Sequence, residues 1–204
     1  MEWNRIKKII QNFKKKNKKT CLSIDTRKSE VMVEGMKYGV DIINDVSGFN
    51  YDDLSLPRME KHQVAKVLHH MQGTPNTMQK NPKYKNVLLD IYDFFEKGVR
   101  NINSKKIIID PGIGFGKNLK HNLTLISKIS LFHSLGFPLL IGTSRKRFIS
   151  QISGVNDSKE RIGGTVASVL FLLSQGVQIF RVHNVNEVKQ GILVFRKILS
   201  NFKN

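Results

Sequence analysis

Acidic and amide side chains stand at the ends of several short apolar runs in this sequence. Asp25 ends the first run, Asn44 lies at the end of the second, and Asp110 ends the fourth. A carboxylate accepts hydrogen bonds, and an amide both donates and accepts them, so these groups are candidates for ligand binding. Two plainer interpretations remain open, because Asp25 could cap the helix that follows it and Asp110 could cap a turn.

Cationic and hydroxyl groups follow the last two runs. The segment GTSRKRF carries Ser144 and Lys146 directly after a run that ends at Gly142, and its plain alternative is a basic loop. Arg181 and His183 are two residues apart, so on a strand they lie on one side and can present two donors to one anion.

Other chemistry-bearing residues give weaker signals. His69 and His70 are adjacent, so on a strand their side chains point to opposite faces, which argues against a shared metal ion. The glycine-rich segment 109–117, IDPGIGFGK, lacks the spacing of a phosphate-binding Walker loop. Cys21 lies in an apolar run, where we expect a buried and inert thiol. No Ser–His–Asp or Cys–His catalytic set is evident.

Strand-like runs alternate with helix-like segments, which is typical of βα units on a parallel sheet. Because the carboxyl ends of the strands meet at one edge in such a fold, we predict a (β/α)8 barrel with functional groups at that edge, and the open doubly wound sheet remains an alternative. We expect one domain over residues 1–204. The predicted strands are 20–25, 41–45, 63–69, 106–110, 137–142 and 178–182, and the main predicted helices are 29–38, 87–100, 122–135, 159–174 and 185–202.

Composition excludes several classes of protein. A hydrophobic fraction of 40% in 204 residues supports a real core, and a single cysteine excludes a disulfide framework. No apolar stretch is long enough for a membrane span and no secretory signal is evident, so we expect a cytoplasmic protein without a membrane partner. The net charge of +18 could attract nucleic acid, but no nucleic-acid-binding motif accompanies it, and we favour a solvated basic helix near the N-terminus.

Six motifs together resemble the dihydropteroate synthases, a family of pterin-binding enzymes. They are SIDTRK, IINDVSG, HMQGTPNTM, DPGIGFGKN, SRKRF and RVHNV, and they occur in this order from about Cys21 onward. The resemblance implies a (β/α)8 barrel transferase of folate biosynthesis, which joins p-aminobenzoate to 6-hydroxymethyl-7,8-dihydropterin diphosphate and releases diphosphate. It also implies Mg²⁺ as a cofactor and a homodimer, since family members commonly pair.

The resemblance also assigns roles to individual residues. Lys146, Arg181 and His183 would be catalytic, and Arg181 and His183 would bind the diphosphate. Ser144 and Phe115, beside Lys146, would border the p-aminobenzoate. The pterin would be held by Asp25, Asn44, Met71, Asp110, Phe115, Gly142 and Lys146.

The sequence departs from the family at its N-terminus. The family's first two strands have no counterpart here, so we expect an incomplete barrel of about six βα units. The family's Asn ligand to Mg²⁺ lies in the first of those strands, so we predict no metal ligand in this chain. The alternatives are a catalytically impaired pterin-binding paralogue, a methyltetrahydrofolate methyltransferase-type domain and, from another class, a basic nucleic-acid-binding protein.

Overall fold

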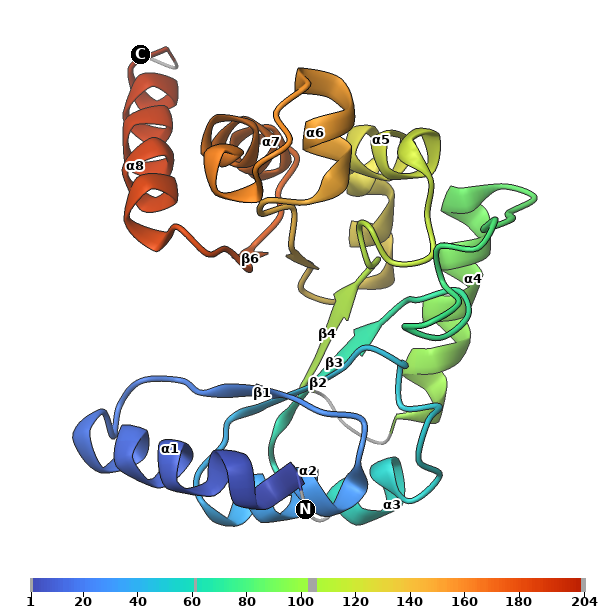
Figure 1. Cartoon of the computed structure of the whole chain (residues 1–204), viewed down its shortest axis with the longest axis vertical. Helices are drawn as coiled ribbons and strands as arrows, with labels where there is room; N and C mark the ends of the chain where they lie inside the picture. The colour runs from blue at the N-terminus through green and yellow to red at the C-terminus, as the bar shows by residue number, and fades with distance from the viewer. Residues whose placement is uncertain (1, 61, 103–105, 203–204) are drawn as a thin grey trace.

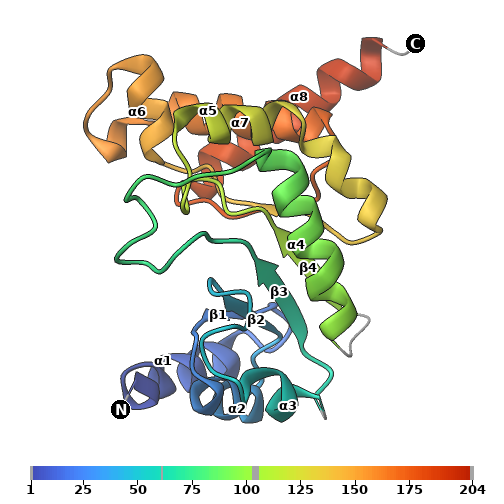
Figure 2. The same cartoon turned by 90° about the vertical axis from the view of Figure 1, so that its right-hand side faces the viewer.

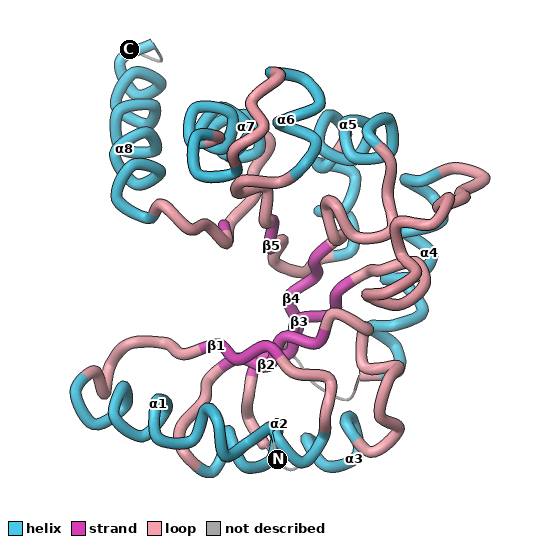
Figure 3. Tube along the Cα trace, in the orientation of Figure 1, coloured by secondary structure: helices cyan, strands magenta, loops and turns pink. Residues whose placement is uncertain are grey.

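Six short parallel strands form the centre of the protein. The computed structural model describes residues 2–60, 62–102 and 106–202. Figure 3 shows the strands as an arc with the helices on its outer side. The strands are β1 (Ser23–Asp25), β2 (Ile42–Asp45), β3 (Ala65–His69), β4 (Ile107–Asp110), β5 (Leu140–Ile141) and β6 (Ile179–Phe180).

The strands lie side by side in the order in which they occur along the chain. β1 to β4 form one sheet and β5 pairs with β6 in a second. A parallel bridge between Ile109 and Leu139 joins the two sheets, and the Ile109 N–H donates to the Pro138 carbonyl at 2.9 Å. The fold is therefore a partial (β/α)8 barrel of six strands, as the alternation of runs predicted.

The helices cover the outer face of this arc (Figures 1 and 2). None of them, within the described residues, is long and apolar enough to cross a membrane. Two short 3-10 helices, Ile129–Leu135 and Ser158–Glu160, complete the set. The α-helices are α1 (Glu2–Lys16), α2 (Ser29–Lys37), α3 (Ser55–Met59), α4 (Val87–Asn101), α5 (Leu119–Ser127), α6 (Arg147–Ser153), α7 (Ile162–Ser174) and α8 (Val185–Phe202).

Local sequence explains where the helices begin and which face they bury. The Asn86 side chain accepts the Leu88 N–H at 3.0 Å and so caps α4, whose Ile91 and Phe95 are fully buried. Asn118 and His121 form a reciprocal capping box at the start of α5. These apolar helix faces and the outward faces of the strands form one continuous core.

Several sequence-based expectations were wrong in detail. The predicted helix 122–135 is α5 followed by a 3-10 helix, because Asn118 caps the chain four residues earlier than expected. The first strand is shorter than predicted and is not buried on both faces, since it lies at the edge of the sheet. Cys21 precedes that strand and is exposed rather than buried. The short helices α3 and α6 were not predicted.

Candidate active site

A cavity of about 400 Å³ lies at the carboxyl ends of the strands, and we call it the central cavity. Its lining comes from segments that follow β2, β3, β4, β5 and β6, so nearly the whole arc contributes. The strand ends meet here because all six strands are parallel. The lining residues are Val46, His69, Asp110, Phe115, Gly142, Ser144, Lys146, Arg181, Val182 and His183.

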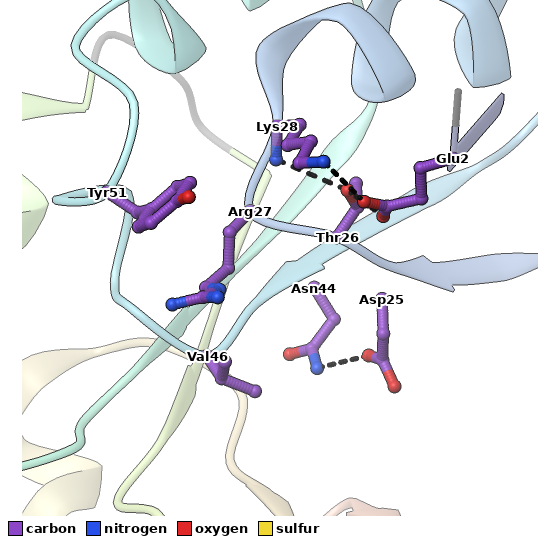
Figure 4. Close-up of a pocket in the computed structure, with 8 residues that line it drawn as sticks. All are labelled: Glu2, Asp25, Thr26, Arg27, Lys28, Asn44, Val46 and Tyr51. Atoms are coloured by element: carbon purple, nitrogen blue, oxygen red, sulfur yellow. Dashed lines mark hydrogen bonds and ion pairs between the residues drawn. The ribbon is translucent and has the colours of Figure 1, made fainter. Parts of the chain in front are cut away.

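A second cavity of about 240 Å³ adjoins the central one at Val46 (Figure 4). Asp25 and Asn44 line it, and the Asn44 amide donates to the Asp25 carboxylate. The Asn44 Oδ1 atom is buried and, among the described residues, has no hydrogen-bond partner. A buried, unsatisfied acceptor costs free energy, so this atom is well suited to receive a ligand's N–H group.

Asp110 supplies an acceptor in the central cavity. One of its carboxylate oxygens accepts the Gly112 N–H at 2.8 Å, so the turn-capping interpretation is correct for that oxygen. The other oxygen lies 3.9 Å from His69 Nε2, beyond hydrogen-bond distance, and Asp110 lines the central cavity. Gly112 is obligatory here, because its φ is +68° and an added Cβ would lie 2.0 Å from the His70 carbonyl oxygen.

Lys146 is a cation shared by two cavities, because it lines the central cavity and a further one beside it. Its ammonium donates to the Ile113 carbonyl and lies 4.8 Å from the centre of the Phe115 ring. Burial lowers the pKa of Lys146 to about 8, although nearby Asp110 opposes this shift. The lysine therefore loses its proton at a lower pH than an ordinary lysine.

Arg181 connects the two ends of the arc. It follows β6, and its guanidinium donates to the Asp25 carboxylate at the end of β1. Both side chains keep solvent access, at 62% and 43% exposure, so a ligand can reach either partner. Five predicted site residues are thus brought together, either directly or around adjoining cavities: Asp25, Asn44, Asp110, Lys146 and Arg181.

The structure also places two further predicted site residues, Met71 and Ser144. Met71 is half-buried in the loop after β3 and does not line the cavities described above. Ser144 lines the central cavity, where its Oγ lies 2.9 Å from His183 Nδ1. This Ser–His pair was not evident in the sequence, because 39 residues separate its members.

A third cavity of about 390 Å³ lies on the far side of Phe115 and Lys146, which line it together with the central cavity. We call it the loop cavity, because the loops after β4 and β5 contribute to it. Arg147 and Lys117 also line it. Ser144 does not line the loop cavity, whereas Phe115 and Lys146 do.

Sequence reasoning missed two buried groups that support the site. The His69 ring packs edge-on against Phe115, with 4.7 Å between ring centres, and burial lowers its pKa. Lys117 is 3% exposed and donates to the Phe115 carbonyl at 2.9 Å, and its Nζ lies 3.1 Å from His70 Nδ1. Burial lowers the pKa of Lys117 to about 7. The GFGK segment contained Lys117, but nothing in it indicated burial.

Residues 2–60, 62–102 and 106–202 hold no group of three or more His, Cys, Asp or Glu side chains that could ligate an ion.

Comparison with known proteins identifies the class to which this fold and site belong. Residues 1–183 match the family described as pterin binding enzyme, and the chain belongs to that family.

Its curated relatives define the family more narrowly. The dihydropteroate synthase of Escherichia coli K12 is 38% identical over 204 residues, which cover 98% of this chain and 70% of the relative. The chain is a member of the dihydropteroate synthase family.

Solved structures agree with this assignment. The Yersinia pestis dihydropteroate synthase, solved as a sulfonamide drug complex, superposes with a TM-score of 0.92 at 33% identity, covering 98% of this chain and 74% of that one. The Thermus thermophilus enzyme has been solved with 4-aminobenzoate (TM-score 0.83, 38% identity, 87% and 70% covered). It has also been solved with 6HMPPP (TM-score 0.88, 35% identity, 94% and 76% covered).

Proposed function

We propose that this chain catalyses the dihydropteroate synthase reaction, in which p-aminobenzoate and 6-hydroxymethyl-7,8-dihydropterin diphosphate give 7,8-dihydropteroate and diphosphate. The observation that supports it most is the division of charge around the central cavity. The acceptors Asn44 and Asp110 come from β2 and β4, in adjoining cavities. The donors Lys146, Arg181 and His183 come from the segments that follow β5 and β6. A donor-rich heterocycle that carries an anionic leaving group matches both sides.

The acceptor side is proposed to hold the pterin. Its amino-pyrimidine edge presents adjacent N–H groups, which the Asp110 carboxylate and the free Asn44 Oδ1 atom can accept. Asp25 orients the Asn44 amide by accepting its N–H, so Oδ1 is the Asn44 atom left for the ligand. Gly142 and Phe115 would flank the ring in this cavity.

The second substrate is proposed to approach through the loop cavity. Phe115 and Lys146 line both this cavity and the central one, so reacting atoms held on the two sides can meet between them. The carboxylate of p-aminobenzoate would find the exposed cation Arg147 in the loop cavity. The relative from Thermus thermophilus has been solved with 4-aminobenzoate and with 6HMPPP, which supports this choice of substrates.

The chemistry needs charge stabilisation more than a strong base. The neutral aryl amine forms a C–N bond to the pterin methylene carbon as the C–O bond to diphosphate breaks. The bonding pair leaves with the diphosphate, and the amine nitrogen gives a proton to solvent. Donors from Arg181 and His183 stabilise the departing anion, while nearby carboxylates stabilise positive charge on the methylene carbon. No step here is assigned to a magnesium ion.

Product formation from both substrates tests this function. We expect the purified chain, supplied with Mg²⁺, to form dihydropteroate, detected by mass spectrometry, and Lys146→Met to lower the rate at least about tenfold. A wild-type chain that binds the pterin diphosphate but forms no product at high enzyme concentration contradicts the catalytic proposal.

Non-catalytic pterin binding is the second candidate. The contact that favours it is the ion pair between Arg181 and Asp25, which occupies the cation needed by the leaving group. If the chain only binds pterin, we expect it to keep its affinity for the pterin and to form no product. The Asp25→Asn variant, which breaks the ion pair with Arg181, should then also form no dihydropteroate above background.

A further inference from the structure

Ser144 and His183 make two hydrogen bonds to each other at the wall of the central cavity. Ser144 Oγ lies 2.9 Å from His183 Nδ1, and the backbone N–H of His183 donates to the same Oγ at 3.2 Å. Ser144 is buried, at 6% exposure. The hydroxyl therefore contacts both the main chain and the ring of the same histidine.

These two contacts select a tautomer of the histidine. The Ser144 oxygen already accepts the backbone N–H, and its single hydrogen has no other acceptor within the described residues, so it donates to Nδ1 when the ring is neutral. Nδ1 is then an acceptor, and the ring hydrogen is on Nε2. In the charged imidazolium both nitrogens carry hydrogen, and Nε2 is again a donor.

The segments that carry the two residues are clamped at a second point. The Arg145 guanidinium donates to Asn184 Oδ1 at 2.7 Å, so each residue of one segment bonds its counterpart in the other. Arg145 has a φ of +60°, which is uncommon for a residue with a side chain, and its backbone is held by Thr165 and Arg161. The Ser144–His183 distance is thus set by a braced loop.

We propose that Ser144 is a positioning residue, which fixes His183 so that Nε2–H faces the central cavity as a donor to the diphosphate group. This inference rests on the proposed function. Arg181, two residues earlier, lines the same cavity and supplies the second donor. Without Ser144 the neutral ring is free to flip or to place its hydrogen on Nδ1, and a lone pair then faces the anion.

A double-mutant cycle with inorganic pyrophosphate as the probe tests whether Ser144 acts through His183. Calorimetry on the full chain gives the Kd of the wild type, Ser144→Ala, His183→Ala and the double variant. We expect Ser144→Ala to raise Kd about three- to tenfold, the scale of one hydrogen bond, and Ser144→Thr to restore it. In the His183→Ala background the serine substitution changes Kd by less than about twofold.

Equal weakening by Ser144→Ala in both backgrounds would mean that the serine acts on its own, and it would overturn the proposal. Ser174→Ala, at the distant end of α7, is the matched control. The midpoint of thermal unfolding of each variant reports loss of folding separately from loss of binding.

A spectroscopic measurement needs no substrate. In protein labelled with ¹⁵N in the histidine rings, the signals absent from His183→Ala belong to His183. At alkaline pH we expect hydrogen on Nε2 alone in the wild type and a mixture of tautomers in Ser144→Ala. Hydrogen on Nδ1 in the wild type, or identical tautomers in both proteins, overturns the role of Ser144. A wild type that shows the expected tautomer but binds no pyrophosphate overturns the diphosphate site instead.

Discussion

The two halves of the strand arc provide opposite chemistry at adjoining cavities. The half made by β1 to β4 contributes acceptors, namely Asp25, Asn44 and Asp110. The half made by β5 and β6 contributes donors from the loops that follow its strands, chiefly Lys146, Arg181 and His183. Charge is therefore sorted by position along the arc.

The two halves of the arc are expected to bind different parts of one substrate, the pterin ring and its diphosphate. If the first half recognises the ring and the second half the anion, a substitution in one half should change one affinity and spare the other. The Arg181–Asp25 ion pair is the direct link between the halves, and the bridge at Ile109 and Leu139 is the backbone link.

The largest effect is expected in the acceptor half. Asp110→Ala leaves the N–H groups of a bound pterin without a charged partner, so pterin affinity should fall by about 2–5 kcal/mol, as for the removal of one member of a buried pair. Calorimetry with 6-hydroxymethyl-7,8-dihydropterin measures this loss, and pyrophosphate affinity should change little.

Two variants control this experiment. Asp110→Asn keeps an acceptor for the Gly112 N–H, so it should preserve the loop after β4. It should still weaken pterin binding, because the negative charge is lost. Asp53→Ala changes an exposed acidic residue outside the site. Unchanged pterin affinity in Asp110→Ala contradicts the assignment of this half to the ring.

The corresponding change in the donor half is Arg181→Ala. We expect pyrophosphate affinity to fall by about 1.5–2 kcal/mol, because a hydrogen bond to a charged group is lost. Pterin affinity should change by less than about threefold, since Asp25 remains. Arg100→Ala, on the exposed face of α4, is the matched control. A larger loss for the pterin than for pyrophosphate would show that the two halves do not divide the substrate.

The pH dependence of stability reports on the buried lysine behind Phe115. The pKa of Lys117 is about 7 in the folded chain, below the ordinary value for lysine, so between pH 7 and 9 the unfolded chain binds more protons. Stability should therefore rise with pH across this window, by at most about 1.4 kcal/mol per pH unit from this group.

Lys117→Met should remove the contribution of this lysine to the pH dependence of the free energy of unfolding. Lys120→Met, which changes a lysine on α5, should leave that pH dependence unchanged. Urea unfolding at several pH values measures both. A slope that is identical in the wild type and Lys117→Met contradicts the depressed pKa.

The smallest effect concerns a cation that serves neither half of the site. Lys66 in β3 is 2% exposed, pairs in register with Ile43 and Ile107, and its pKa is lowered by burial. Lys66→Met should raise the free energy of unfolding by about 1 kcal/mol, because it removes a buried charge. Chemical denaturation measures this, and a destabilised variant would indicate that the ammonium reaches solvent.

The alternation of short apolar runs with helical segments determined the number and order of the strands. Each run was compact enough for burial, and the polar residue that ends it was visible in the sequence. Boundaries were less predictable. α5 begins at Leu119 because Asn118 and His121 form a capping box. Cys21 is exposed because it precedes the edge strand, whose pairing with β2 begins only at Ser23.

Local patterns and motifs are sufficient to predict the fold class, the family and the identity of the polar groups at the strand ends. Which of those groups touch one another depends on how the whole chain packs. Ser144 and His183 are 39 positions apart, and Arg181 and Asp25 are 156 positions apart. Lys117 is buried against His70, which lies 47 positions earlier. Such contacts, and the pKa shifts that follow from burial, arise from packing and have no local signature.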